Sequence, residues 1–381
     1  MAIDFEAEGL LESLEGPARE ARLELLRRFE GDGYELEALR TASEEGRLPL
    51  LAVERDIAGG GNRYTAAEVS ERSGLEQEFL ERLWRALGMP LPDPDERTFT
   101  EADLEAAVRT EALRDAGLSD ESIVEIGRVM ARATFGVASA VVRVFSETFV
   151  EAGDDEQSLA LRYAEASREL TPMLGPVIEH VLGVQQRSLI RQTAVDLSTL
   201  ETGRLPQGEL VSVAFADLVG FTRLGENLDP AELGAVAERL DALAVEVAQP
   251  PVRLIKTVGD AAMLQSADTD ALIEATLALV EAAEAADDGF PSLRAALARG
   301  EALERAGDWF GRPVNRASRV ADIARPGSLL VDDAVKEDAD EDRWCFSDAG
   351  KCSLKGVKGS VSLHRARRRV SEGAETGGAE T

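Results

Sequence analysis

The stretch Leu254-Ile255-Lys256-Thr257-Val258-Gly259-Asp260 predicts a strand that turns at a glycine and presents a carboxylate. A second strand end is predicted by Val213-Ala214-Phe215-Ala216-Asp217-Leu218-Val219-Gly220-Phe221-Thr222, with Asp217 in a comparable position. Carboxylates at two strand ends form a site suited to two hard divalent cations. Lys256, four residues before Asp260, is placed to contact a ligand. The combination indicates chemistry on a nucleoside triphosphate.

The region around these stretches, residues 210–370, alternates strands and helices. Side chains alternate at every second position from Val211 to Asp217, which is the period of a strand. Asp229-Pro230-Ala231-Glu232 has the cap, proline and glutamate that begin a helix. The predicted elements are a strand at 211–217, a helix from 229, a hairpin of strands at 252–258 and 261–265, a helix at 268–286, a strand at 293–299, a helix at 314–324 and a strand at 328–331. Their order predicts an α+β, ferredoxin-like domain.

Residues 1–200 are predicted to be helical throughout, because apolar side chains recur there at helical spacing. The segment from Ser119 to Val150 is long, apolar and rich in small residues. Further helices over 156–200 are expected to break near Pro172 and Pro176. The apolar segment has three interpretations: an ordinary helical core, a dimerisation bundle or a lipid-sized pocket.

The composition changes at residues 201–209, where glycine and proline predict a linker. The last residues are rich in Gly, Glu and Thr and predict a disordered end. The predicted organisation is a helical regulatory or dimerisation domain at 1–200, a linker at 201–209, a catalytic domain at 210–370 and a disordered tail at 371–381.

The formal net charge of −30 disfavours binding to nucleic acid or to anionic membranes, because surfaces that bind phosphate are basic. Residues 64–90 predict a helix, a turn at Gly74 and a second helix, which is weakly similar to the winged-helix opening of MerR-type regulators. Glutamates outnumber arginines in this segment. We therefore interpret it as a packing unit and expect no nucleic-acid partner.

The sequence contains no run of about 18 uncharged apolar residues, so it predicts no membrane-spanning helix. Its start lacks the basic and apolar regions of a signal peptide. We therefore expect a cytoplasmic protein without an integral membrane span. Cys345 and Cys352 are too few for a disulfide framework or a zinc site and are interpreted as reduced thiols. Only His180 and His364 are histidines, which disfavours a histidine-based triad or metal site.

A third candidate cluster spans residues 307–319. Asn315 and Arg319 are four positions apart and share one face of a helix, where they suit a ribose contact and a developing phosphorane charge. Gly220-Phe221-Thr222 lies in a turn that can hold a polyphosphate. Taken singly, each feature has a simpler interpretation: an aspartate at a turn, a capping asparagine or a solvated arginine.

Residues 210–367 resemble the catalytic domain of class III nucleotidyl cyclases. The resemblance is carried by five blocks in order: FADLVGFT at 215–222, KTVGD at 256–260, GDWFG at 307–311, VNRASR at 314–319 and LKGVKG at 354–359. Five ordered blocks are a specific signal. One departure is Ala298-Arg299-Gly300, where many relatives have His-x-Gly, and we expect catalysis to survive it.

The resemblance implies a role for each matching residue. Asp217 and Asp260, with the backbone carbonyl of Leu218, match the ligands of two divalent cations, Mg²⁺ or Mn²⁺. Lys256 and Asp308 match the pair that reads adenine.

The remaining matches concern the sugar and the phosphates. Asn315 matches the residue that positions the ribose, and Arg319 matches the residue that stabilises the transition state. Lys355 matches a lysine that holds the triphosphate, with Lys358 as a second choice. Gly220, Phe221 and Thr222 fall in the turn next to the phosphates.

The chemistry of the base agrees with ATP as the substrate. Adenine offers an acceptor at N1 and a donor at its exocyclic amine, whereas Lys256 is a donor and an ionised Asp308 is an acceptor. Guanine reverses this edge, and a guanylyl cyclase of this family is expected to carry an acidic residue at the lysine position.

The family implies attack of the ribose 3′-oxygen on the α-phosphorus, which gives 3′,5′-cyclic AMP and pyrophosphate. It also implies a head-to-tail homodimer in which each site draws on both chains. Asp217 and Asp260 would serve one site, while the base-reading and ribose-contacting residues of the same chain serve the other.

The helical region before the catalytic domain is similar to that of soluble bacterial cyclases whose N-terminal domain restrains the catalytic pair. Some such relatives respond to pH, and a fatty acid can bind there. We therefore expect an autoinhibitory or sensing role for residues 1–200, with His180 as a proton sensor or a packing histidine. The alternatives are an inactive cyclase-like dimerisation module and a DNA-binding regulator that uses residues 64–90.

Overall fold

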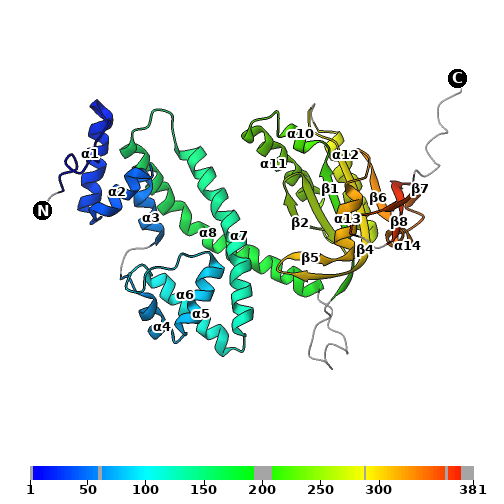
Figure 1. Cartoon of the computed structure of the whole chain (residues 1–381), viewed down its shortest axis with the longest axis horizontal. Coiled ribbons are helices and arrows are strands. Elements are labelled where there is room, and N and C mark those ends of the chain that lie inside the picture. Colours follow the sequence, from blue (N-terminus) through cyan, green and yellow to red (C-terminus); the bar gives the residue numbers. More distant parts are fainter. Residues whose placement is uncertain (1–2, 59–61, 193–207, 287–288, 357–358, 370–381) are drawn as a thin grey trace, which may run out of the picture. The chain divides into compact units, whose positions relative to one another are not determined.

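The computed structural model describes residues 3–58, 62–192, 208–286, 289–356 and 359–369 (Figure 1). The chain divides into two compact units, residues 1–194 and residues 195–381. Residues 201–207 of the predicted linker, the predicted tail and Lys358 lie outside the described residues.

The described part of the first unit is helical, as its apolar spacing predicts. Its elements are α1 (Gly16–Gly31), α2 (Leu36–Glu44), the 3₁₀ helix η1 (Leu48–Leu50), α3 (Leu51–Ala58), α4 (Ala66–Ser73), α5 (Gln77–Leu87), α6 (Glu101–Asp115), α7 (Asp120–Phe149) and α8 (Glu156–Gln192). One core joins α1, α2 and η1 around Leu26 and Phe29. A second joins α4 to α7 around Leu80 and Trp84.

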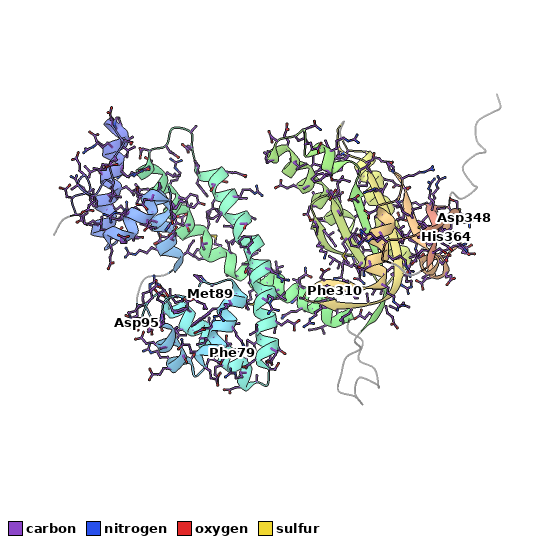
Figure 2. The ribbon with its side chains drawn as sticks, viewed as in Figure 1. Phe79, Met89, Asp95, Phe310, Asp348 and His364 are labelled. Carbon is purple, nitrogen blue, oxygen red and sulfur yellow. The ribbon has the colours of Figure 1, made fainter. Side chains whose placement is uncertain are left out.

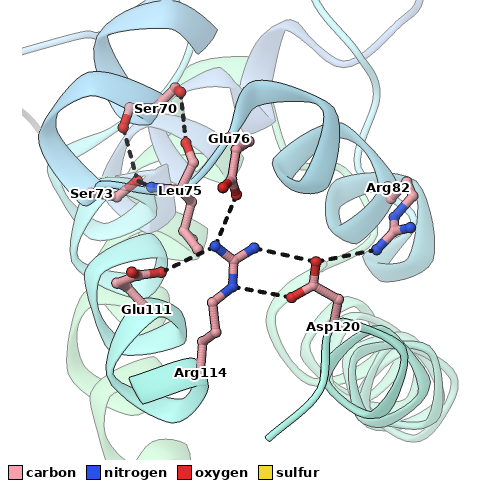
Figure 3. A network of polar contacts seen from close by, with 8 residues as sticks. All are labelled: Ser70, Ser73, Leu75, Glu76, Arg82, Glu111, Arg114 and Asp120. Carbon is pink, nitrogen blue, oxygen red and sulfur yellow. Dashed lines mark hydrogen bonds and ion pairs between the residues drawn. The ribbon is translucent and has the colours of Figure 1, made fainter. Parts of the chain in front are cut away.

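A network around Arg114 ties α5, α6 and α7 together (Figure 3). The Arg114 guanidinium donates to Glu76 at 2.8 Å and to Asp120 at 3.0 Å, and Arg82 lies 3.7 Å from Asp120. Glu76 and Asp120 stand at the N-terminal ends of α5 and α7, where the helix dipole favours negative charge. The segment at 64–90 is therefore built into a helical core, in line with its interpretation as a packing unit.

The predicted break near Pro172 and Pro176 is wrong, because α8 continues through both prolines. Each proline removes one helical hydrogen bond and costs about 3 kcal/mol in a helix interior. The two prolines are four positions apart, so their distortions fall on the same short stretch. Ala160 and Tyr163 are buried in the preceding turns and anchor the helix.

The apolar segment at 119–150 is not an ordinary core within a single chain. Ile123 is buried, but Met130, Phe135 and Val142 are exposed on α7. By length and composition alone, α7 is also a candidate membrane span, with a mean hydropathy of 1.3 over its most apolar window, none of it buried. Arg132 and Arg143 interrupt this helix, so it contains no uncharged run of about 18 residues.

The second unit is built on one eight-stranded sheet with the order β2-β3-β1-β4-β6-β8-β7 and with β5 paired to β4. Its elements are β1 (Glu209–Leu218), α10 (Phe221–Leu224), α11 (Pro230–Val247), β2 (Arg253–Val258), β3 (Ala261–Ser266), α12 (Thr269–Glu284), β4 (Leu293–Arg305), β5 (Asp308–Gly311), α13 (Arg312–Ala321), β6 (Leu329–Asp332), α14 (Asp333–Asp338), β7 (Trp344–Ser353) and β8 (Ser360–Arg368). The first four strands confirm the predicted ferredoxin-like order. Strands β5, β7 and β8 were not predicted.

Alternation along β1 decides which side chains face which helices. Ala216 and its same-face neighbours pack against Leu240 of α11 and Leu279 of α12. On the other face, Val320 of α13 packs against the sheet. Asp217 alternates with Ala216, so its carboxylate lies on the face that α13 covers.

Candidate active site

Asp217 and Asp260 lie side by side at one end of the central strands. Asp217 is in register with Ala261, the first residue of β3. Asp260 immediately precedes Ala261, in the two-residue loop that joins β2 to β3. The backbone N–H of Leu218 donates to the carbonyl of Asp260 at 2.8 Å and ties the two turns together. Gly259 has a φ of 61°, a left-handed value that favours glycine in such a loop. The structure therefore brings the two predicted carboxylates together.

The carboxylate of Asp217 is held by Arg294, a residue of β4 directly opposite on the neighbouring strand. Arg294 Nε donates to Asp217 Oδ2 at 2.7 Å, and Nη2 lies 2.5 Å from the same oxygen. Burial raises the pKa of the Asp217 carboxyl above its usual value, the Arg294 charge opposes this, and the charge of Asp260 adds to it.

Lys256 and Asp308 form an ion pair. Lys256 Nζ donates to Asp308 Oδ2, while Asp308 Oδ1 accepts from the backbone N–H of Trp309 at 2.9 Å. Trp309 is buried with Met263 and fixes β5 over the sheet. The structure thus pairs the two residues that the sequence assigns to adenine.

Asn315 and Arg319 share the exposed face of α13. The opposite face is anchored by Val320 and by Arg316, whose Nη1 donates to the buried Asp332 carboxylate at 2.6 Å. Gly311 precedes the helix, and a Cβ there would lie 2.8 Å from a backbone carbonyl of β4. Glycine therefore allows the close approach that positions α13.

The predicted phosphate contacts are more scattered. Gly220 has a φ of 78° and immediately precedes α10, where Phe221 is half-buried and Thr222 is exposed. Lys355 is exposed in the loop after β7. Leu354, which precedes it, packs in one cluster with Ala296 of β4 and Val320 of α13, so this loop reaches the face of the sheet that α13 covers.

The two histidines lie apart from these residues. His180 is exposed on α8 in the first unit. His364 lies on β8 in register with Asp348, both labelled in Figure 2, and its Nε2 is 2.7 Å from Asp333 Oδ1. The hydrogen bond with His364 holds the pKa of Asp333 below its usual value.

Sequence reasoning missed Arg294 altogether. Its contact with Asp217 depends on the register between β1 and β4, and no local motif reveals a register between strands so far apart in the chain. The only available signal was the alternation of β4, which places Arg294 on the opposite face from its buried neighbours Leu293 and Ala295.

The donors around Asp217 fit Mg²⁺ or Mn²⁺ by their chemistry. Asp217 Oδ1, the Asp260 carboxylate and the Leu218 carbonyl are all oxygens, which hard divalent cations prefer. Within the described residues no group of three or more His, Cys, Asp or Glu could hold a metal ion. The fit therefore rests on the carboxylate pair and its neighbouring carbonyl, an arrangement that suits Mg²⁺ shared with substrate phosphates.

Comparison with known proteins agrees with the motifs. The adenylate cyclase regulatory domain family matches residues 3–190. The chain is 39% identical to the pH-sensitive adenylate cyclase MT1302 of Mycobacterium tuberculosis, over 100% of this chain and 96% of that protein. It is 33% identical to an adenylate cyclase of Streptomyces coelicolor, over 81% of each. The alignment with the crystal structure of the adenylyl cyclase CyaB from P. aeruginosa spans 43% of this chain and 97% of the CyaB chain, at 20% identity and a TM-score of 0.39.

The catalytic motifs and the mixed α/β fold that carries them define a nucleotidyl cyclase of class III. The chain belongs to the adenylate cyclases that carry an N-terminal adenylate cyclase regulatory domain.

Proposed function

We propose that this adenylate cyclase acts as a head-to-tail homodimer with two shared sites. The observation that carries the proposal is the separation of its functional groups within one chain. Lys256 is in register with Met263, and Met263 with Phe215, so Lys256 lies two strands from β1, about 10 Å across the sheet, and two residues back from Asp217. Its side chain bonds Asp308 of β5. The base-reading pair and the carboxylate pair therefore occupy different places on one protomer, and a second copy supplies the complement.

In each site, Asp217 and Asp260 of one chain would bind two divalent cations together with the triphosphate. When bound, the cations would neutralise phosphate charge and make the ribose 3′-hydroxyl easier to deprotonate. Lys256 and Asp308 of the partner chain would orient the base.

The sugar and phosphate contacts complete the proposed reaction. Asn315 would hold the ribose so that its 3′-oxygen faces the α-phosphorus in line with the leaving pyrophosphate. Arg319 would stabilise the charge that develops on the phosphate oxygens. Lys355 would hold the triphosphate.

Incubation with ATP and either Mn²⁺ or Mg²⁺ is expected to yield cyclic AMP, whereas GTP is expected to react about 100-fold less efficiently or worse. The reason is that GTP would place donors against Lys256 and acceptors against Asp308, and buried unpaired polar groups are costly. Product formation is measured by chromatography with both nucleotides at equal concentration. Intact dimers that form no cyclic product would instead favour an inactive cyclase-like module.

An exposed apolar face on α7 and α8 supports self-association of the first unit. Phe135 is 75% exposed, and Met130, Val177 and Val181 are also exposed. Apolar faces of this extent usually mark an interaction site. We assign this one to a second copy of the chain rather than to lipid because Arg143 on the same helix is charged and pairs with an acidic neighbour, which is costly in a membrane.

A separate cavity of about 250 Å³ in the first unit suits the proposed lipid partner better than the apolar segment does. Its lining includes the apolar Leu25 and Phe29. The charged residues that line it are Arg28, Arg55, Arg168, Asp32 and Asp56, of which Arg168 pairs with Asp56 at 2.9 Å. The volume is slightly below the roughly 300 Å³ at which ligand pockets usually begin. Arg28 and Arg55 would pair with a carboxylate head, and Leu25 and Phe29 would contact the first part of an acyl chain.

We further propose that the first unit restrains catalysis near neutral pH. His180 is exposed on α8 beside Val177 and Val181, and histidine changes its charge between about pH 5 and 8. A charge gained at low pH would oppose association of this apolar face and release the catalytic units. The printed name of the mycobacterial relative, pH-sensitive adenylate cyclase, supports a response to pH in this family.

Comparison of the intact chain with residues 195–381 tests the regulation. As pH falls from 8 to 6, the activity of the intact chain relative to the catalytic unit is expected to rise about fivefold or more, the lower end of typical coupling free energies. His180→Asn, which stays polar but does not titrate, is expected to flatten this rise. Equal specific activities and identical pH profiles of the two proteins would disprove the restraint, and an unchanged profile of His180→Asn would exclude that residue as the sensor.

A further inference from the structure

Arg294 contacts two parts of the catalytic unit at once. Its Nε and Nη2 both engage Asp217 Oδ2, and its Nη1 donates to the backbone carbonyl of Asp322 at 2.6 Å. Asp322 is the residue that ends α13. One guanidinium therefore joins a proposed metal ligand to the helix that carries Asn315 and Arg319.

The geometry leaves Asp217 able to bind a cation. Both described contacts of Arg294 with Asp217 fall on Oδ2, so Oδ1 keeps its lone pairs for a metal. The Asp217 side chain is only 16% exposed and that of Arg294 27%, so neither reorients freely in water. A planar guanidinium with donors in a fixed fork is suited to hold both partners at a defined distance, which an ammonium group does not do.

The two ends of this bridge serve different sites if the proposed function holds. Asp217 belongs to the site where this chain supplies the metal ligands. Helix α13 belongs to the site where this chain supplies Asn315 and Arg319. When a cation shares the charge of Asp217, the attraction between Asp217 and Arg294 weakens, and the guanidinium is freer to bond the Asp322 carbonyl at the end of α13.

We propose that Arg294 is a positioning residue that couples the metal end of one active site to helix α13 of the other. The proposal rests on the shared-site function. It predicts that loss of Arg294 in one chain impairs both sites of a dimer, including the site whose metal ligands come entirely from the unmodified chain.

Isolated heterodimers with two affinity tags test this prediction. An Arg294→Met chain paired with an Asp260→Ala chain has one working site, which uses the metal end of the Arg294→Met chain. Paired with a Lys256→Ala chain, it has one working site that uses its α13 instead. Both heterodimers are expected to lose about tenfold in kcat relative to the same pairs with an unmodified Arg294, as small misplacements of reacting groups commonly do.

A second measurement does not depend on catalysis. Hydrogen–deuterium exchange of the intact dimer without nucleotide is expected to slow about threefold or more in the last turn of α13 when Mn²⁺ is added. Arg294→Met removes this response. Arg294→Lys restores the contact with Asp217 but not the bond to Asp322, so it also lacks the response.

Arg299→Met is the matched control for general loss of stability. Arg299 lies on the same strand and joins β4 to α14 through Asp338 at 3.1 Å. It is expected to lower the melting temperature comparably without changing the exchange of α13 or separating the two heterodimers.

The outcomes separate the two hypotheses. If only the heterodimer that uses the Arg294→Met metal end loses activity, or if α13 does not respond to Mn²⁺ in the unmodified dimer, the coupling is disproved. The reference pair of Lys256→Ala with Asp260→Ala reports on the shared site itself. Inactivity of that isolated heterodimer would refute the shared-site function rather than the role of Arg294.

Discussion

Arg319→Ala is expected to lower kcat about 10³-fold while the KM for ATP changes little. The guanidinium of Arg319 is exposed on α13 and is proposed to meet charge that develops only in the transition state. Arginines that act on a transferring phosphoryl group commonly contribute about 10³-fold or more. Initial rates over a range of ATP concentrations, with Mn²⁺ held in excess, give the two constants separately.

Two matched variants sharpen this measurement. Arg319→Lys retains the positive charge but loses the planar fork, and is expected to fall between the alanine variant and the unmodified enzyme. Arg325→Ala removes an exposed arginine just beyond α13 and is expected to leave kcat unchanged. If Arg319→Ala raised KM with kcat intact, Arg319 would be a binding residue for the ground state instead.

Lys256→Ala and Asp260→Ala are each expected to be nearly inactive, and their mixture is expected to regain about a quarter of the unmodified activity. Random exchange places about half of the dimers in the mixed form, and each mixed dimer has one complete site of two. The complete site combines Asp260 of one chain with Lys256 of the other. The mixture is assayed after subunit exchange, and sedimentation confirms that dimers are present.

A second mixture controls for nonspecific rescue. Lys256→Ala and Asp308→Ala both damage the base-reading end, so every site in their heterodimer lacks one of the two groups. This mixture is expected to stay inactive at the same dimer concentration. Rescue in both mixtures, or in neither although heterodimers form, would contradict the shared-site arrangement.

The sequence predicted those parts of the fold in which local pattern and tertiary structure agree. The alternation that ends at Asp217 and the cap at Asp229 correspond to β1 and α11, and Gly259 turns the hairpin as expected. β7 was missed because most of its side chains are exposed, which leaves no apolar alternation. The break at Pro172 was wrongly predicted because packing elsewhere along α8 outweighs a local defect.

The candidate site likewise has residues that local motifs predict and residues that only the tertiary structure places. Lys256 with Asp308, and Asp217 with Asp260, could be paired by motif, and the structure places each pair together. Arg294 could not be found because its role depends on strand register. Three interpretations of the apolar segment on α7 stayed open because a single sequence does not show that Phe135 is exposed.

The ion pair between Lys256 and Asp308 bears on which part of the nucleotide contributes most to its affinity. Lys256 and Asp308 bond one another, so a base that contacts both side chains would replace one set of charge-assisted hydrogen bonds by another. The net gain in binding free energy from adenine would then be small, whereas guanine would break the ion pair without forming matching hydrogen bonds in its place. In the proposed site, tight binding would then come mainly from the triphosphate, and the base would serve mainly to exclude other nucleotides. Pyrophosphate and other polyphosphates would accordingly compete well for the site, although they carry no adenine.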